Sequence, residues 1–85
     1  MRAQALAFST GLITIRTGGS VSVTFINDDA GEDHNFEIQA PGAPLRDTCI
    51  GPCRDAYTFA APPPGSYSFY CITHPDMGGE LRVTP

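Results

Sequence analysis

Apolar and polar residues alternate along most of this chain, and this period of two is the feature that most limits how it folds. Between Ser20 and Phe25 apolar side chains occupy every second position, as on a β-strand with one buried face. The same pattern predicts strands at 12–16, 34–39, 55–60, 65–71 and 80–84, with a weaker one at 4–8. Turn-forming Gly, Pro, Asn and Asp residues separate these segments. The sequence therefore predicts an all-β fold of about seven short strands and no long helix.

The 85 residues leave room for one hydrophobic core, so we expect a single domain spanning residues 1–85. Short alternating strands joined by turns are typical of a small antiparallel β-sandwich. Residues 40–54 are too rich in Pro and Gly for a long element and are expected to form an irregular excursion. The predicted core consists of Ile13, Ile15, Val21, Val23, Phe25, Phe36, Ile38, Phe59, Tyr67, Phe69, Leu81 and Val83.

The last predicted connection carries three side chains that bind metals. Cys71, His74 and Met77 follow one another at intervals of three residues, in a short loop that ends at a Gly-Gly pair. The other histidine of the chain, His34, stands at the head of a predicted strand. Each of these residues alone has an ordinary structural explanation, such as a small buried thiol or a methionine that fills a gap. Together they are hard to obtain from core packing, so we expect all four to bind one metal ion.

One thiolate and two imidazoles in a plane, with a weak thioether bond along the axis, form the ligand set of a blue-copper site. Soft sulfur favours Cu(I) and imidazole accepts both oxidation states, so the site needs little rearrangement when it gains or loses an electron. Four protein ligands leave no obvious room for a substrate, which favours electron transfer over catalysis. Two alternatives stay open from the residues alone. One is a module that binds or delivers Cu(I) without shuttling electrons, and the other is a structural Zn(II) site.

The segments 33–36 (Asp-His-Asn-Phe), 64–71 and 71–77 resemble the cupredoxins, and among them the small plastocyanin- and amicyanin-like proteins. The resemblance covers most of the chain, from Leu12 to Val83. The short gap between the histidine and the methionine of the last loop is most similar to that of amicyanin. The resemblance implies a Greek-key β-sandwich that holds one mononuclear type 1 copper ion and carries single electrons.

The resemblance also implies a role for each site residue. His34, Cys71 and His74 would be the equatorial copper ligands. Met77 would be the axial ligand. The backbone N–H of Asn35 would donate to the Cys71 sulfur and its side chain would join the two ligand loops, contacts that fix ligand orientation and tune the redox potential. The ring edge of His74 would reach the surface and serve as the port for electrons.

Cys49 and Cys53 lie outside the pattern of these relatives. Three cysteines are an odd number, and assigning Cys71 to the metal leaves this pair over. A disulfide is the favoured interpretation, with free thiols or a second metal site as the alternatives. A disulfide would place the protein outside a reducing cytosol, and the family resemblance likewise implies an extracytoplasmic location, whether periplasmic, secreted or at a membrane surface. A binuclear copper centre is excluded because the loop after Cys71 holds no second cysteine.

The net charge of −4 arises from 5 basic and 9 acidic residues, without a basic run, which excludes nucleic-acid binding. The longest apolar runs are too short for a membrane span or a signal-peptide core. The acidic turn at Asp28, Asp29, Glu32 and Asp33 is either a solvated loop or a charged rim that steers a basic partner. We therefore expect a soluble monomer that is not an enzyme and that carries electrons between redox partner proteins.

Overall fold

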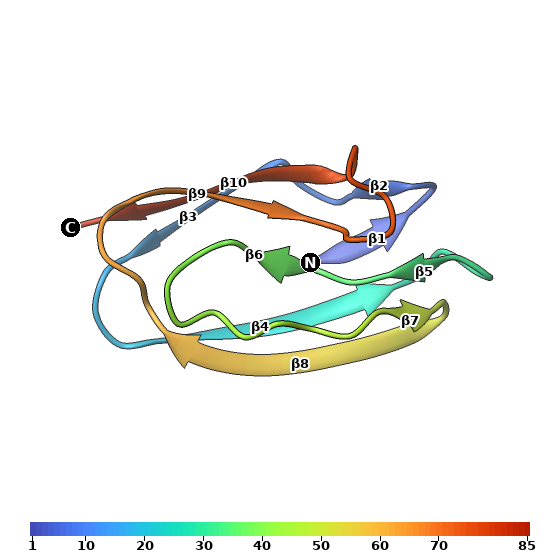
Figure 1. Ribbon diagram of the computed structural model, residues 1–85, viewed down its shortest axis with the longest axis horizontal. Coiled ribbons are helices and arrows are strands. Elements are labelled where there is room, and N and C mark those ends of the chain that lie inside the picture. The colour runs from blue at the N-terminus through green and yellow to red at the C-terminus, as the bar shows by residue number, and fades with distance from the viewer.

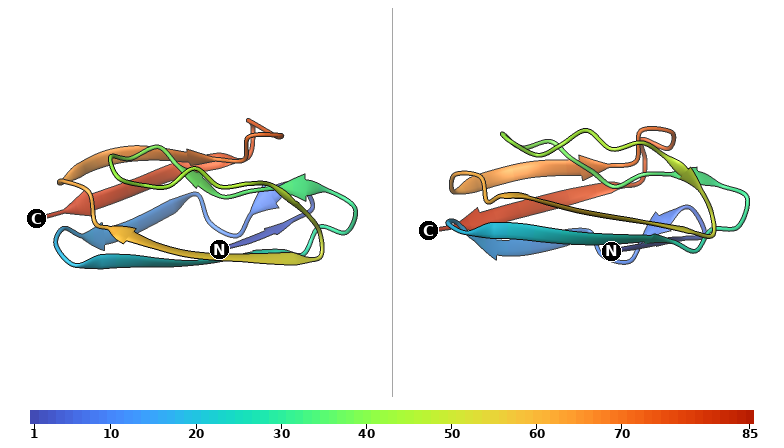
Figure 2. Two further views of the ribbon diagram at one scale, coloured as in Figure 1. Left: turned by 60° about the horizontal axis from the view of Figure 1, so that its bottom comes forward. Right: turned by 90° about the horizontal axis from the view of Figure 1, so that it is seen from below.

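The computed structural model describes residues 1–85 and consists of β-strands and loops. Two four-stranded sheets, in the orders β2-β1-β4-β8 and β3-β10-β9-β6, form the layers of a sandwich, and β5 and β7 form a small third sheet (Figures 1 and 2). The strands are β1 (Arg2–Gln4), β2 (Ala7–Phe8), β3 (Leu12–Arg16), β4 (Ser20–Asn27), β5 (Asp33–His34), β6 (Glu37–Ile38), β7 (Cys49–Ile50), β8 (Cys53–Ala60), β9 (Gly65–Tyr70) and β10 (Gly78–Thr84). The structure has no helix long and apolar enough to cross a membrane. The predicted all-β sandwich is confirmed.

Most strands occur where the alternation predicts them. β3 begins and ends at the predicted residues, and β4, β8, β9 and β10 differ from the prediction by at most two residues at either end. The segment predicted as one strand at 34–39 is instead two short strands, β5 and β6, because Asn35 and Phe36 leave the ladder between them. Pairing is antiparallel apart from two pairs, since β1 runs parallel to β4 and β3 runs parallel to β10.

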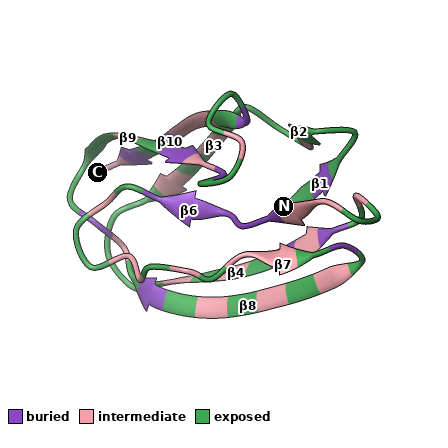
Figure 3. Ribbon diagram, turned by 45° about the vertical axis from the view of Figure 1, so that its right-hand side comes forward, coloured by how far each residue is buried: buried purple, intermediate pink, exposed green.

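Phenylalanine side chains dominate the core. Phe25, Phe36 and Phe69 are almost completely buried. The ring of Phe8, which the sequence analysis leaves out of the core, meets these three rings edge-on at centroid distances of 6.2, 5.4 and 5.7 Å respectively, a favourable arrangement for aromatic pairs. Figure 3 shows the buried strand β6 and the alternating exposure along β8 that the period of two predicts.

The core prediction is wrong for five residues. Ile13, Ile15, Val21, Val23 and Tyr67 pack against the core but are only partly buried. The two isoleucines and the two valines line an apolar groove of about 180 Å³. The groove stays open because the first strand segment reaches along β4 only as far back as Thr24, through Met1, which leaves residues 20–23 without a partner on that edge. The remaining predicted core residues are buried: Phe25, Phe36, Ile38, Phe59, Phe69, Leu81 and Val83.

One end of the sandwich gathers the segments that carry the candidate ligands. β5 holds His34, and the loop 71–77 joins β9 to β10 (Figure 1). The backbone at the start of β10 passes very close to Gly11 and Phe69, and this contact fixes where the loop lies. A Cβ atom at Gly79 would be 2.4 Å from the carbonyl oxygen of Gly11 and 2.6 Å from the ring of Phe69, so only glycine lets the chain pass here.

Candidate metal centre

Backbone hydrogen bonds close the loop 71–77. The N–H of Cys71 donates to the carbonyl of Met77 at 3.0 Å. The N–H of Met77 donates to the carbonyl of His74 at 2.9 Å, and the N–H of His74 donates to the carbonyl of Cys71 at 3.2 Å. Each of these three candidate ligands is thus bonded to the other two. The backbone of the loop alone therefore keeps them together.

His34 reaches this loop from a distant part of the sequence. It lies in β5, where it pairs with Cys49 of β7. Its side chain is completely buried, and its ring meets that of His74 with the centroids 4.7 Å apart. The fold therefore brings both histidines of the chain to one place.

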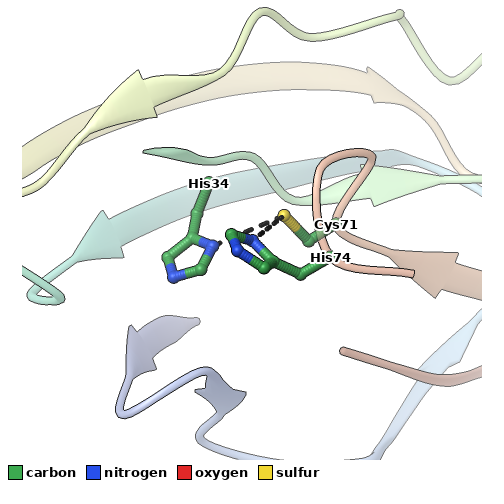
Figure 4. Close-up of side chains that lie close together, drawn as sticks. All are labelled: His34, Cys71 and His74. Carbon is green, nitrogen blue, oxygen red and sulfur yellow. Dashed lines mark hydrogen bonds between the residues drawn. The ribbon is translucent and has the colours of Figure 1, made fainter. Parts of the chain in front are cut away.

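Three donor atoms converge at this place (Figure 4). The Cys71 sulfur lies 3.5 Å from Nδ1 of His34 and 3.8 Å from Nδ1 of His74, and the three ligand atoms all lie within 4.8 Å of one another. A metal that binds a Cys sulfur at about 2.3 Å and a His nitrogen at about 2.0 Å sets the two atoms roughly 3.5–3.7 Å apart. The donors therefore fit a single ion, and one soft sulfur with two imidazoles suits copper.

The candidate ligands differ sharply in exposure. Cys71 and Met77 are buried within the hydrophobic core cluster, and the side chain of His34 has no exposed surface. The side chain of His74, in contrast, is 31% exposed. His74 is therefore the candidate ligand that solvent or another protein can reach.

Asn35 connects the two segments that meet at the site. Its backbone N–H donates a hydrogen bond to the Cys71 sulfur. Its side-chain oxygen accepts from the N–H of Ile72 at 2.9 Å, and its side-chain amide donates to the carbonyl of Arg46 at 3.0 Å. Asn35 is buried, so little water competes for these bonds. They hold the end of β9 against β5.

The protonation of Cys71 reflects two opposing effects. Burial raises the pKa of this thiol because a low-dielectric surrounding disfavours the thiolate. Hydrogen bonds, chiefly from Thr73 and the Asn35 backbone, stabilise the thiolate and outweigh burial, so the pKa falls from 9.0 to about 6. At neutral pH the sulfur is therefore mostly in the form that binds metals.

This low pKa leads to a first prediction. As the pH rises, the ultraviolet thiolate absorbance of the metal-free protein should appear with a midpoint near pH 6 rather than 9. Below that midpoint protons compete with a metal for the sulfur, so metal uptake should weaken as the pH falls. A spectroscopic pH titration measures the midpoint, with a Cys71→Ser protein as the control. A midpoint near 9 would contradict the hydrogen-bonding account.

Three further side chains contact the histidines, although the sequence analysis assigned them no such role. Oδ2 of Asp29 lies 3.0 Å from Nε2 of His34, and Oε2 of Glu32 lies 3.6 Å from Nε2 of His74. Oγ1 of Thr73 lies 3.1 Å from Nδ1 of His74. Two carboxylates of the acidic turn therefore contact the candidate ligands, so the turn is more than a solvated loop or a charged rim around the site. The sequence offered one sign of a role for the acidic turn, namely its position directly before His34. The only comparable sign for Thr73 was its place between two candidate ligands.

Cys49 and Cys53 form a disulfide, which confirms the favoured interpretation, and Cys71 is the free cysteine. Because both sulfurs of the pair are bonded, free thiols and a second Cys-x3-Cys metal site are excluded. The disulfide joins β7 to the start of β8, and β7 pairs with the strand that carries His34.

No family model matches the sequence. The structure is similar to auracyanin from Roseiflexus castenholzii, with a TM-score of 0.84 and 25% identity over 99% of this chain and 94% of that one. Auracyanin B gives a TM-score of 0.85 with 24% identity over 99% and 86% of the two chains. Amicyanin from Paracoccus versutus gives 0.69 with 23% identity over 96% and 76%. The chain has the cupredoxin fold, and its His34-Cys71-His74 cluster suits copper. The resemblance to the cupredoxins that its motifs indicated is confirmed.

A curated relative is an enzyme. Nitrous-oxide reductase from Stutzerimonas stutzeri is 32% identical over 93 residues. The alignment includes the whole of this chain, but the chain spans only 14% of the length of that enzyme. The similarity therefore concerns one part of a much longer protein.

Proposed function

We propose that this chain is a type 1 copper protein that carries one electron at a time between redox partner proteins. His34, Cys71 and His74 would hold the copper, with Met77 as a fourth and weaker ligand. Bound copper supplies the Cu(II)/Cu(I) couple, which takes one electron from a donor protein and gives it to an acceptor. The observation that carries the proposal is the meeting of one sulfur and two imidazole nitrogens within 4.8 Å.

The protein contributes a site whose shape depends little on the oxidation state. The loop 71–77 is closed by its own hydrogen bonds, and Asn35 ties it to the segment after β5. Donors held in this way move little when the charge at the site changes, so the structural cost of electron transfer is small. Such a site favours a carrier rather than an enzyme.

We place the electron port at His74. Its side chain is partly exposed, whereas the other candidate ligands are buried. The neighbouring Ile72 is 53% exposed and offers an apolar surface against which a partner can exclude water. The carboxylate of Glu32 lies beside the same ring. The net charge of −4 and this carboxylate favour a partner with a basic docking surface.

The disulfide supports a location outside a reducing cytosol. An extracytoplasmic carrier of this kind is periplasmic, secreted or bound at a membrane surface. Its electron donor and acceptor are then proteins of the same compartment.

Adding Cu(II) to the purified metal-free protein tests the proposal. We expect one copper per chain and an intense visible band, caused by charge transfer from the Cys71 thiolate, that disappears on reduction and returns on reoxidation. A protein that holds Cu(I) but loses copper on oxidation would be a delivery module. A colourless protein that prefers Zn(II) would have a structural zinc site. Either of these results would overturn the proposed electron carrier.

Replacing Met77 by Leu is expected to keep the intense band and to raise the redox potential. Leucine fills a similar volume but donates no electron pair, and an apolar group near the metal disfavours the more highly charged Cu(II) state. A tenfold loss of Cu(II) binding relative to Cu(I) corresponds to about 59 mV for one electron. A redox titration that follows the visible band measures the shift. An unchanged potential would remove Met77 from the ligand set.

A further inference from the structure

A carboxylate lies behind one of the two histidines. Oδ2 of Asp29 is 3.0 Å from Nε2 of His34, whereas Nδ1 of the same ring is 3.5 Å from the Cys71 sulfur. The His34 side chain is fully buried and that of Asp29 is only 17% exposed. A carboxylate only accepts hydrogen bonds. In a neutral ring Nε2 therefore carries the hydrogen, and Nδ1 keeps its lone pair directed towards the sulfur.

We propose that Asp29 is a positioning residue: it holds His34 in the tautomer and orientation that bind copper, and its charge favours the Cu(II) state. The effect on copper rests on the function proposed above. The effect on the tautomer concerns the metal-free protein and is independent of that function.

Asp29 is itself held from several directions. The N–H of Leu6 donates to the same Oδ2 atom at 2.9 Å. The N–H of Asp29 donates to Oδ1 of Asn27 at 2.9 Å, and its carbonyl accepts from the N–H of Glu32 at 3.0 Å. A Cβ atom at Gly51 would lie 2.3 Å from that carbonyl oxygen, so the disulfide loop packs directly against it. A carboxylate fixed in this way can orient the ring that it contacts.

The hairpin turn between β1 and β2 supports the same conclusion. Its two residues, Ala5 and Leu6, have φ angles of 52° and 59°. Residues with a Cβ atom rarely adopt this left-handed conformation, and two-residue hairpins that need it usually contain Asn-Gly or Asp-Gly. Tertiary contacts must therefore hold the turn, and the bond from Leu6 to Asp29 is one of them. Backbone outliers of this kind concentrate at functional sites.

The carboxylate acts on a bound metal through the imidazole ring. By accepting the Nε2–H of His34 it makes Nδ1 a stronger donor. A stronger donor and a nearby negative charge both stabilise Cu(II) more than Cu(I). Removing a contact of this kind typically costs 10- to 100-fold in metal affinity. If the loss falls on Cu(II), the potential rises by about 59 mV for each tenfold change.

The first experiment uses the metal-free protein. The ¹⁵N chemical shifts of His34 are measured by NMR at a pH where the ring is neutral, in a Cys71→Ser background in which no thiolate faces Nδ1, and they report which nitrogen carries the hydrogen. In that background we expect only the Nε2–H tautomer when Asp29 is present and a mixture of both tautomers in Asp29→Ala. Asp28→Asn is the matched control, because it removes a neighbouring carboxylate that pairs with Arg2 rather than with the ring. An Asp29→Ala protein with the wild-type tautomer would overturn the positioning role.

The second experiment measures the potential of the copper-loaded protein. Asp29→Asn keeps a side-chain oxygen and the size of the residue but loses the charge, so it retains the fold even if Asp29→Ala does not. We expect one copper per chain, an intense band and a potential about 59 mV higher, the equivalent of a tenfold change. Asp28→Asn should match the wild type. An unchanged potential in Asp29→Asn, or an equal rise in Asp28→Asn, would contradict the inferred charge effect. A wild type without the band would instead refute the proposed function and leave the NMR result to decide the tautomer.

Discussion

Replacing Cys71 by Ser is expected to abolish the visible charge-transfer band and to leave a folded protein. Cys71 is the free cysteine of the chain and is fully buried. A serine hydroxyl has a similar size but does not ionise at neutral pH, so it supplies no thiolate to a metal. Copper affinity should fall by more than the 10- to 100-fold that loss of a hydrogen-bonding partner of a ligand typically costs. Absorbance and a competition titration with a copper chelator measure the two effects.

A double variant, Cys49→Ser with Cys53→Ser, is the matched control. It removes two sulfur atoms and leaves Cys71 in place, so the band should persist. Circular dichroism establishes that each variant is folded before copper is added. If the Cys71→Ser protein turned blue, another group would be supplying the charge-transfer band, and the ligand assignment would be wrong.

The same double variant is expected to be less stable than the wild type by about 2 kcal/mol. The disulfide joins residues with a sequence separation of 4, and closing so short a loop contributes about 2 kcal/mol on the chain-entropy model. For a domain of this size each kcal/mol shifts Tm by roughly 4–8 °C, so Tm should fall by roughly 8–16 °C. Thermal and urea denaturation of the metal-free protein measure the loss.

The position of the disulfide adds a second effect. Cys49 pairs with His34 between β7 and β5, and the buried side chain of Asn27 donates to the carbonyls of Cys49 and Glu32 at 2.9 and 3.0 Å. Loosening β7 therefore loosens the strand that carries a candidate ligand. Copper affinity should fall in the double variant, but less than in Cys71→Ser. Chemical reduction of the wild-type disulfide should reproduce the lower Tm. A double variant that melts with the wild type would show that the hydrogen bonds alone hold this region.

The alternation of apolar and polar residues correctly predicted the strands that pair with a neighbouring strand along their whole length. β3 is one such strand, and its bounds agree with the prediction. Alternation was a poor guide where distant contacts interrupt a strand. The break between β5 and β6 occurs at Asn35, whose side chain bonds to Ile72 and Arg46. These partners are distant in the sequence, so no local pattern indicates the break.

Alternation predicted burial correctly only where neighbouring strands cover the strand. Phe25 and Phe69 point inward on strands that neighbours cover, and both are buried as expected. Ile13 and Val21 have the same alternating pattern but line the open groove. Their partial exposure depends on how far β1 extends along β4, which is a property of the assembled sheet.

The sequence by itself determined which donor groups the protein has: three cysteine sulfurs, two imidazoles and two thioethers, with one of each kind in a single short loop. Those properties belong to the side chains and to their spacing along the chain. Only the tertiary structure decided which nitrogen of His34 faces Cys71, that Asp29 contacts the other nitrogen, and that His74 reaches solvent. The contact between His34 and Cys71 joins segments 37 residues apart, and it fixes the orientation of the ring that Asp29 then meets from five residues away. Packing of this kind is decided by the whole fold.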